Sequence, residues 1–439
     1  MDSITRYAIV GTGGRHEIYR DALLGVYSKQ AELTGLCDSN IGRSRLSAAW
    51  IEKHYSRKAP VYSAEHFDDM IRDTRPDVVI VTTKDSMHDY YIVRAMELGC
   101  DVITEKPMTI DAARCTSILE MQQRTGRRLR VTFNYRYSPL RTQIKHLLMN
   151  DIIGKVVSVD FHWMLDTRHG ADYFRRWHRN KENSGGLLVH KATHHFDLIN
   201  WWLDTTPETV YATGRRAYYT PAIGDQLGLG RRAERCHGCP EAAGCSFYLS
   251  LKDNKYLRTL YLEQEQYDKY YRDRCVFSDS IDIEDSMTLA VSYRNGAHMS
   301  YSLNAFMPWE GYMVVFNGTK GRLEHKCEGS VYINGDGSVP GSLKREGSWI
   351  RVYPHFAPAY EEFIWEASGG HGGGDKLLLQ DLFAPDSTED PYGRRADQYG
   401  GAWSILTGIA ANLSIQNKMP VHTLDLVPLL TDKTGCYLK

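Results

Sequence analysis

The sequence has little excess charge, few cysteines and no long apolar run. Its 53 Lys and Arg residues nearly balance 54 Asp and Glu residues, giving a formal net charge of −1. A chain-wide electrostatic footprint for nucleic acid or an anionic membrane is therefore missing, although local basic patches stay open. The chain has no run of about 18 apolar residues, and its first residues lack the basic flank and apolar core of a signal peptide. We expect a cytoplasmic protein with neither a nucleic-acid nor a membrane partner.

Length and composition indicate a folded protein of more than one domain. At about 150 residues per domain, 439 residues predict two or three domains. The hydrophobic fraction of 42% and the charged fraction of 24% are ordinary for globular proteins and argue against long disorder. The 28 tyrosines suit an amphipathic ligand such as a carbohydrate, and core packing explains them equally well.

Residues 1–150 have the pattern of an α/β domain. Short apolar runs such as RYAIVG, DVVIVTT and CDVITEK alternate with amphipathic, helix-like stretches. Continuous apolar runs are typical of strands covered on both faces, so this alternation predicts a doubly wound parallel sheet.

Residues 151–439 change to a period of two. Alternating runs such as KVVSVDFHWML and SMTLAVSY, with a turn signal at Asn295-Gly296, predict an α+β domain with a large, mostly antiparallel sheet. A polar insertion covers about residues 218–279, and a glycine-rich loop covers residues 368–375. No third independent domain is expected.

A nucleotide site is predicted where the first strand ends. Gly11, Gly13 and Gly14 permit a tight turn and close approach of a pyrophosphate to a helix N-terminus, although His16 stands where the usual motif has its third glycine. Asp38, at the end of the second strand-like run, suits the two ribose hydroxyls and favours NAD over NADP. The nearby Arg43 is the residue that would reverse this preference.

Several motifs together resemble the Gfo/Idh/MocA oxidoreductase family. They are GTGGRH at the first turn, VVIVTTKDSMH ending at His88, Glu105-Lys106-Pro107, the segment at residues 134–137 and GTKGRLE at residues 318–324. The resemblance implies a Rossmann domain, an open-faced sheet used for substrate binding and for assembly into a dimer or tetramer, and NAD(P)-dependent hydride transfer on sugars or polyols. The expected cofactor-binding residues are Gly11, Gly13, Gly14, Arg15, His16, Asp38, Arg43, Thr83, His88, Glu105, Lys106, Asn134 and Arg136.

The same resemblance implies that Lys106 orients and polarises the reacting hydroxyl of the substrate. The family's second motif, D-x-G-x-H-x-x-D, aligns with residues 190–197. His194 and Asp197 match it, whereas His190 and Ala192 replace the usual Asp and Gly. On a helix, a spacing of three lets Asp197 orient the His194 imidazole. A metal held by the clustered histidines is the alternative interpretation.

One branch of the family, the NAD-dependent glycosidases, oxidises a sugar at carbon 3, eliminates the aglycone, adds water and reduces the ketone again. Lys191, the Tyr135/Tyr137 pair and the glycine-rich loop resemble that branch. Such a route needs several acid/base groups, which Lys106, Tyr135, Lys191, His190 and His194 would supply. We expect His371 and Asp375 to close over the sugar. A plain sugar or polyol dehydrogenase is the alternative enzyme, and an NAD-binding sensor or scaffold is the non-enzymatic alternative.

The segment at residues 166–179 is rich in arginine and aromatic residues. Arg168, Arg175, Arg176 and Trp177, together with His190, suit an anionic pyranose, because guanidinium groups bind tetrahedral anions and aromatic faces pack on sugar rings. The pattern resembles the NAD-dependent sulfoquinovosidases. A solvated face or a subunit contact is the alternative.

Four of the nine cysteines, Cys236, Cys239, Cys245 and Cys275, lie in the polar insertion. The insertion has few apolar residues, and a zinc ion held by four thiolates would order it. Disulfides, free thiols and an iron–sulfur cluster are the alternatives.

Overall fold

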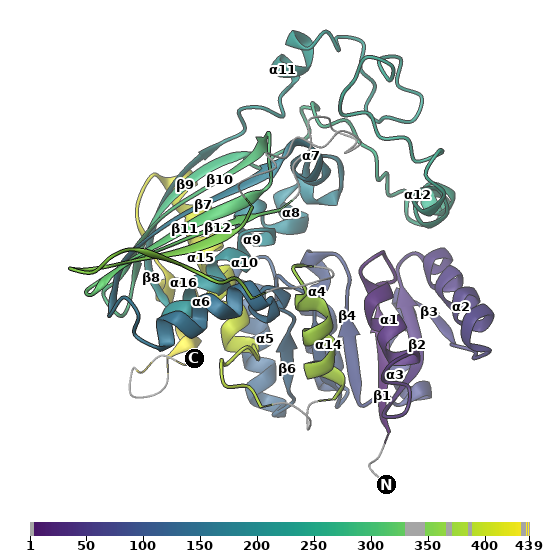
Figure 1. The fold of residues 1–439 in the computed structure, drawn as a ribbon. Helices are drawn as coiled ribbons and strands as arrows, with labels where there is room; N and C mark the ends of the chain where they lie inside the picture. Colours follow the sequence, from purple (N-terminus) through teal and green to yellow (C-terminus); the bar gives the residue numbers. More distant parts are fainter. Residues whose placement is uncertain are drawn as a thin grey trace.

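A computed structural model describes residues 4–329, 347–365, 371–384 and 389–431 with residues 436 and 438. It contains two sheets that lie side by side, linked by helices (Figure 1). Within these residues, none of the helices has the length and apolar character needed to span a membrane.

The first sheet has six parallel strands in the order β3-β2-β1-β4-β5-β6, which confirms the predicted doubly wound domain. Its strands are β1 (Thr5–Val10), β2 (Ala31–Asp38), β3 (Val61–Ser63), β4 (Val78–Val81), β5 (Asp101–Thr104) and β6 (Leu129–Val131). The helices that cover it are α1 (His16–Leu24), α2 (Ile41–Tyr55), α3 (Phe67–Thr74), α4 (His88–Glu97) and α5 (Ala112–Thr125). The strand order reverses between β1 and β4, the point at which such sheets bind ligands.

The second sheet has nine strands in the order β14-β13-β12-β11-β7-β10-β9-β8-β15. Of the strand pairs that the structure describes in this sheet, β7 with β10 is the parallel one. This confirms the predicted α+β domain with a mostly antiparallel sheet. The strands are β7 (Val156–Asp166), β8 (Pro207–Arg215), β9 (Ser286–Tyr293), β10 (His298–Met307), β11 (Gly311–Gly318), β12 (Gly321–Glu328), β13 (Trp349–Pro354), β14 (Tyr360–Glu362) and β15 (Val421–His422). Buried and exposed residues alternate along β9, so one face packs on the core and the other is open.

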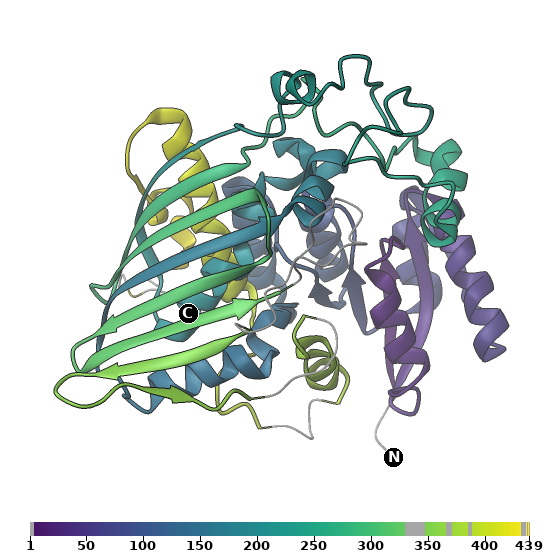
Figure 2. The same ribbon diagram turned by 45° about the horizontal axis from the view of Figure 1, so that its top comes forward.

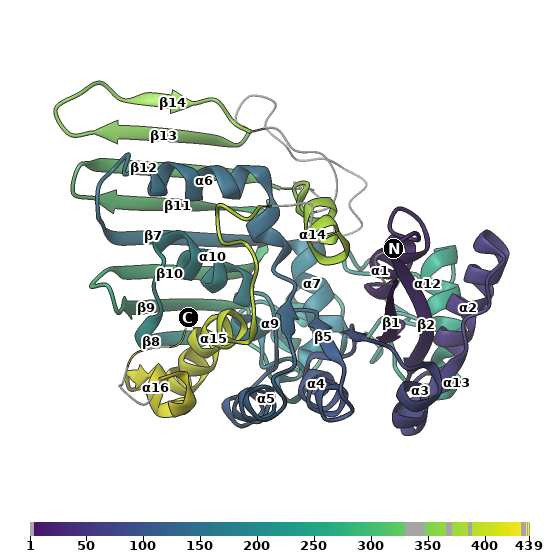
Figure 3. The ribbon, with the colours of Figure 1, turned by 90° about the horizontal axis from the view of Figure 1, so that it is seen from below.

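Most of the remaining helices pack along one face of the second sheet, whereas α14 packs beside α1 of the first domain (Figure 3). These remaining helices are α6 (Pro139–Met149), α7 (Thr167–Arg175), α8 (Lys181–Ser184), α9 (Leu187–His190), α10 (Thr193–Leu203), α14 (Gly374–Phe383), α15 (Gln398–Asn417) and α16 (Thr423–Leu426). The chain also returns to the first domain near its end, because Phe383 packs edge-on against Tyr7 with ring centroids 5.2 Å apart. The C-terminal segment therefore helps to cover the parallel sheet.

The predicted polar insertion forms an extended arm, residues 218–279, between β8 and β9. It carries α11 (Pro221–Gln226), α12 (Lys255–Leu260) and α13 (Glu265–Asp268). Figures 1 and 2 show the arm arching from the second sheet to the outer edge of the first domain, where α12 lies close to α2. The arm thus spans both domains.

Candidate active site

A cavity of about 1350 Å³ lies between the carboxyl ends of the parallel strands, the second sheet and the arm. Most of the predicted site residues meet there. Those that line the cavity are Gly11, Gly13, Gly14, Arg15, Asp38, Arg43, Thr83, His88, Glu105, Lys106, Asn134, Tyr135, Arg176, Trp177, His190, Lys191, His194 and His371.

The glycine turn fits a dinucleotide. Gly11 has a φ of +92°, and a Cβ there would lie 2.6 Å from the backbone of Thr82, so the position accepts glycine alone. Gly13 faces open space, since a Cβ there would meet nothing within 4 Å. The Asp38 carboxylate is fixed at the end of β2, because it accepts hydrogen bonds from the backbone N–H of Thr12 at 2.5 Å and of Asn40 at 2.7 Å. This cradle and carboxylate suit the pyrophosphate and ribose of NAD.

His16, which replaces the third glycine, lies outside the cavity. It is buried, and its ring nitrogens lie 2.5 Å from the Gly13 carbonyl and 2.7 Å from the Ser47 hydroxyl. Burial lowers its pKa to about 4, so the ring is neutral. His16 therefore links the glycine turn to helix α2 through these two hydrogen bonds.

Arg43 faces the arm. Its Nε donates to the Leu260 carbonyl at 3.3 Å, and its Nη1 lies 2.9 Å from the Asp268 carboxylate. Asp268 therefore neutralises the Arg43 guanidinium, the positive charge that would otherwise bind the 2′-phosphate of NADP. This pairing agrees with a preference for NAD.

The Glu105-Lys106-Pro107 segment follows β5 and enters the middle of the cavity. Glu105 accepts hydrogen bonds from Arg15 Nε at 2.5 Å and from the Tyr19 hydroxyl at 2.6 Å. Lys106 Nζ donates to the His190 carbonyl at 3.3 Å. Burial lowers the pKa of Lys106 to about 8, although the negative charges of Asp85 and Glu105 oppose this shift. Near neutral pH this amine therefore exists in both protonation states.

Asp85 is a site residue that the sequence analysis missed. Its Oδ2 lies 2.5 Å from His190 Nδ1, and both side chains line the cavity. Burial raises the pKa of Asp85 well above its usual range and lowers that of His190. The available signal was a carboxylate just after a buried strand, in the segment that also holds the predicted cofactor-binding residues Thr83 and His88. His88 itself lies 2.7 Å from the Pro107 carbonyl and holds two loops together.

Tyr135, Lys191 and His194 form one cluster in the cavity. The rings of Tyr135 and His194 stack with centroids 4.0 Å apart, and Lys191 Nζ donates to the Tyr135 hydroxyl at 3.3 Å. Burial lowers the pKa of His194 well below its usual range, and no described residue contacts its Nδ1 by a hydrogen bond. Burial also opposes the charge on Lys191, but Tyr135, Tyr173 and Glu310 outweigh it and raise that pKa. A neutral imidazole thus lies beside a charged ammonium.

The prediction that Asp197 orients His194 is wrong. Asp197 is buried and forms a two-pronged ion pair with Arg136, whose Nε and Nη2 lie 2.8 and 2.5 Å from its two oxygens. The spacing of three residues allowed contact with His194, but a guanidinium from a distant segment takes both oxygens. Arg136 therefore lies outside the cavity. So does Tyr137, whose hydroxyl donates to Asp381 at 2.8 Å.

The predicted substrate segment is divided by the fold. Arg176 and Trp177 line the cavity, and Arg176 Nη1 lies 3.3 Å from Asp172. Arg175 points into the arm and donates to the Phe247 carbonyl at 3.1 Å, while Arg168 is exposed and outside the cavity.

The glycine-rich loop contributes His371 to the cavity, and residues 366–370 lie outside the described part of the chain. Asp375 does not line the cavity. It accepts hydrogen bonds from His371 at 2.8 Å and from Asn134 Nδ2 at 2.8 Å, and its Oδ1 lies 3.6 Å from Arg15. Burial disfavours its charge, but these partners hold its pKa at about 2. Asp375 therefore positions the residues around the cavity.

Glu310, just after β10, was also missed. Its Oε1 accepts from His169 Nδ1 at 2.7 Å, and a backbone hydrogen bond at Asp166 also stabilises the carboxylate. The residue lines the cavity near Lys191, and its negative charge helps to raise the pKa of that lysine.

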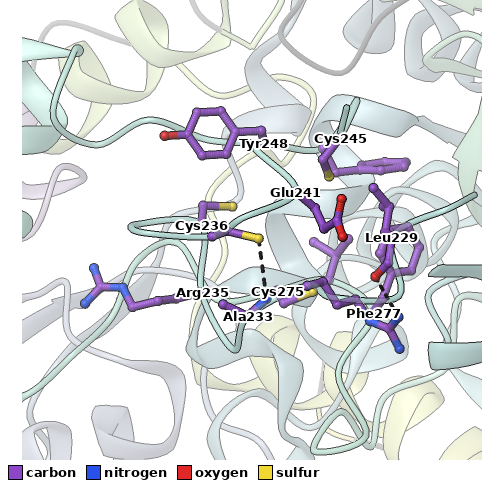
Figure 4. Close-up of a pocket in the computed structure, with 13 residues that line it drawn as sticks. Leu229, Ala233, Arg235, Cys236, Glu241, Cys245, Tyr248, Cys275 and Phe277 are labelled. Atoms are coloured by element: carbon purple, nitrogen blue, oxygen red, sulfur yellow. Dashed lines mark hydrogen bonds between the residues drawn. The ribbon is translucent and has the colours of Figure 1, made fainter. Parts of the chain in front are cut away.

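The four cysteines of the arm line a separate cavity of about 20 Å³. Figure 4 shows Cys236, Cys245 and Cys275 around one small space beside Glu241. Over the part of the chain that the structure describes, no group of three or more His, Cys, Asp and Glu side chains is positioned to hold a metal ion. The structure therefore supports neither the predicted zinc nor a metal at the clustered histidines.

A doubly wound domain with a glycine turn, joined to an open-faced sheet with a buried lysine between them, defines a dinucleotide-dependent oxidoreductase. Residues 5–133 match the family model described as "Oxidoreductase family, NAD-binding Rossmann fold", and residues 145–423 match "Oxidoreductase family, C-terminal alpha/beta domain". The chain belongs to the Gfo/Idh/MocA family of oxidoreductases.

Three similar proteins illustrate the relationship. A Bacillus subtilis protein that carries the name oxidoreductase YteT is 38% identical over 92% of this chain and 94% of its own length. An inositol 2-dehydrogenase/D-chiro-inositol 3-dehydrogenase of Lactiplantibacillus plantarum is 26% identical over 45% of this chain and 52% of its own. The structure of the WlbA dehydrogenase from Bordetella pertussis, solved with NADH and UDP-GlcNAcA, superposes with a TM-score of 0.60 at 16% identity, covering 95% of this chain and 98% of that one.

Proposed function

We propose that this protein oxidises a hydroxyl group of a sugar or polyol and transfers the hydride to NAD. The observation that carries the proposal is that Lys106 and His194 face the same cavity as the glycine turn and Asp38. The dehydrogenases of inositol among the relatives support the same class of substrate. NAD, when bound, supplies the hydride acceptor.

The side chains in the cavity divide the remaining work. Lys106 holds the reacting hydroxyl and, in its neutral form, accepts the proton at Nζ as the hydride leaves. The His194 imidazole, which lines the cavity, forms a hydrogen bond with a neighbouring hydroxyl. Lys191 donates to a sugar oxygen, and the negative charge of Glu310 lies at the same end of the cavity. Together, these groups position one of the substrate's several hydroxyls for hydride transfer.

The charges around the cavity bear on the choice of substrate. Arg15 pairs with Glu105 and Arg176 pairs with Asp172, whereas Arg141 and Lys191, which also line the cavity, lie against the Tyr135 ring. Of the three arginines predicted to bind an anionic sugar, Arg176 is the one that lines the cavity. The predicted arginine segment therefore gives a sulfonated sugar little support, and the cations near Tyr135 are the groups that would bind an acidic substituent.

The redox-neutral glycosidase is the second candidate. What favours it is the surplus of acid/base groups, because the Lys191–Tyr135 pair and Glu310 are not needed for hydride transfer from a simple alcohol. Elimination at carbon 2 and protonation of the leaving group need such separate groups.

One experiment separates the two functions. Purified protein is mixed with NAD and a panel of free sugars, polyols and aryl glycosides, and NADH fluorescence and aglycone release are recorded together. NADH formation without aglycone release supports the dehydrogenase. Aglycone release without net NADH formation, together with exchange of the carbon 2 proton with solvent, supports the glycosidase. If neither NADH formation nor aglycone release is seen with any compound of the panel, both proposed functions are contradicted.

We also propose that the four thiols of the arm bind zinc. They line one cavity, and the N–H groups of Leu249 and Ala233 donate to the sulfur atoms of Cys236 and Cys239, each at 3.4 Å. Burial raises the pKa of the Cys236 thiol, so the metal would have to displace its proton. Binding requires the side chains to rotate and converge. Metal analysis should find about one zinc per chain, lost in Cys236→Ser. Less than about half a zinc per chain in purified protein contradicts the proposal.

Finally, we propose a dimer or tetramer formed through the open face of the second sheet. Thr288, Ala290 and Ser292 of β9 are exposed on that face, as a sheet that pairs with another copy requires. Light scattering tests the proposal, and a monomer at working concentration contradicts it.

A further inference from the structure

The arm is fastened to the nucleotide-binding domain beside the cavity. Asn40 Nδ2 donates to the Gln264 carbonyl at 3.0 Å, and Arg43 is bonded to the Leu260 carbonyl and to Asp268. Asn40 caps helix α2, so these contacts reach the end of β2, where a ribose is expected.

The contact between the arm and the domain is also closely packed. A Cβ at Gly42 would collide with the Gln264 and Tyr267 side chains, and one at Gly14 would lie 2.8 Å from the Tyr256 hydroxyl. That hydroxyl donates to Glu17 at 3.2 Å. The arm therefore rests on the glycine turn and on the start of α2.

Side chains of the arm form one wall of the large cavity. Tyr261, Asp268, Lys269 and Tyr270 line it together with Asp38, Ser39 and Ala64 of the first domain. The rings of Tyr261 and Tyr270 lie on the Arg43 guanidinium, with 5.5 and 5.6 Å between its carbon and the ring centroids. Tyr261 and Arg43 are each only 8% exposed. The end of the cavity nearest Asp38 is thus enclosed by two aromatic rings and two charged groups.

The arm is also anchored at its base. Arg272 of the arm lies 2.7 Å from Asp172 of α7, Arg175 of α7 donates to the Phe247 carbonyl at 3.1 Å, and Phe247 and Phe277 are buried in the core of the second domain. A segment fixed at both ends does not swing aside freely, since several buried contacts would have to break together.

We propose that the arm is part of the dinucleotide site, and that Tyr261, Asp268, Lys269 and Tyr270 enclose the adenosine end of NAD so that the cofactor leaves slowly. The proposal rests on the proposed function in taking NAD as the ligand. Lys269 lines this end of the cavity, where its ammonium would offset the negative charge of a bound dinucleotide, and the rings of Tyr261 and Tyr270 would cover apolar surface of the nucleoside. Asp268 adds a second carboxylate at the ribose end and disfavours a 2′-phosphate.

The test measures the release of the cofactor without any sugar. Protein loaded with NADH is mixed with excess NAD, and the loss of bound-NADH fluorescence gives the dissociation rate. Tyr261→Ala removes one wall of the cavity, and Asp268→Asn breaks the ion pair with Arg43 while keeping the side-chain shape. Glu263→Gln is the matched control, because it also removes a carboxylate from the arm. Glu263 pairs with Arg258 at 3.5 Å, both side chains are exposed, and Glu263 does not line the cavity.

We expect both cavity variants to release NADH at least about tenfold faster than the wild type, and Glu263→Gln to match the wild type. Asp268→Asn should also narrow the preference for NADH over NADPH. Circular dichroism confirms that each variant is folded, and Asp268→Asn keeps the test valid should Tyr261→Ala fail to fold. Dissociation rates within about twofold of the wild type for both folded variants overturn the proposal. Because no sugar is present, this outcome is independent of whether the protein oxidises one.

Discussion

The pKa values of two lysines in the cavity are shifted in opposite directions, so only one of them is expected to titrate near pH 8. Burial brings the pKa of Lys106 to about 8, whereas Tyr135, Tyr173 and Glu310 overcome burial at Lys191 and raise its pKa. The neutral amine of Lys106 is the form that accepts the hydroxyl proton. Its share is about one tenth at pH 7, about one half at pH 8 and about nine tenths at pH 9. The kcat/KM for oxidation should therefore rise about fivefold between pH 7 and pH 8, less than about twofold from pH 8 to pH 9, and then level off.

Substitution separates the roles of the two lysines. Lys106→Met should remove the rise near pH 8 and lower kcat by about two to four orders of magnitude, the usual contribution of a positioned base. Lys191→Met should also slow the reaction, because a hydrogen bond to the sugar is lost. It should keep the rise near pH 8, since Lys191 stays protonated across this range.

The assay is the rate of NADH formation between about pH 6 and pH 9 with saturating NAD, with circular dichroism to show that each variant is folded. In the reverse direction, with a ketone and NADH, the rate should fall above pH 8, because the protonated amine is then the reactive form. A flat profile for the wild type, or a rise near pH 8 that survives Lys106→Met, refutes the assignment of the proton to Lys106.

Two further substitutions test the cofactor turn and the buried ion pair. Gly11→Ala places a Cβ 2.6 Å from the Thr82 backbone at a φ of +92°, so NAD affinity should fall by at least about tenfold in a fluorescence titration; unchanged affinity contradicts the predicted turn. Arg136→Met leaves the buried Asp197 carboxylate unpaired and should destabilise the fold by about 3–5 kcal/mol in urea unfolding. NAD affinity of the folded variant should match the wild type, because Arg136 lies outside the cavity; a loss of affinity at unchanged stability would support its predicted cofactor role.

The first domain was predictable because its signals are local. The turn after β1, the apolar runs and the carboxylate after β2 each lie within a few residues, and the order of elements then specifies a parallel sheet. The lysine of Glu105-Lys106-Pro107 was predictable by resemblance, whereas its place beside His190 depends on the tertiary fold, which brings the end of β5 to the end of helix α9.

The partners of buried charges were not predictable, because they come from distant parts of the chain. Asp197 takes Arg136 as its partner rather than the imidazole one helical turn away, since a planar guanidinium satisfies both carboxylate oxygens at once. Asp85 bonds His190, which is 105 residues further along the chain. In both cases spacing showed which contacts were geometrically allowed, while the tertiary fold decided between them.

The arm shows how one segment can carry two kinds of information. Its cysteines and its lack of apolar residues were visible in the sequence and suggested a metal-ordered insertion. Its contact with Asn40 and Arg43 joins residues more than two hundred positions apart, and no local pattern indicates it. The functional part of the insertion is thus its outer end, whereas the sequence drew attention to its base.

A cofactor that stays bound changes which reactions can turn over. Removal of a hydride from a carbinol carbon, with the hydroxyl proton taken up by Lys106, leaves a carbonyl compound and one reduced cofactor in the cavity. With the arm in place, the next cycle requires the hydride and the proton to return to a carbonyl carbon in the same cavity, either that of the oxidised sugar or that of a second sugar. Oxidation of the sugar alone should then slow after about one bound NADH per chain has formed, and an added carbonyl compound should reoxidise that NADH and let sugar oxidation continue without net NADH formation. Continuous accumulation of free NADH would show instead that the arm does not hold the cofactor during turnover.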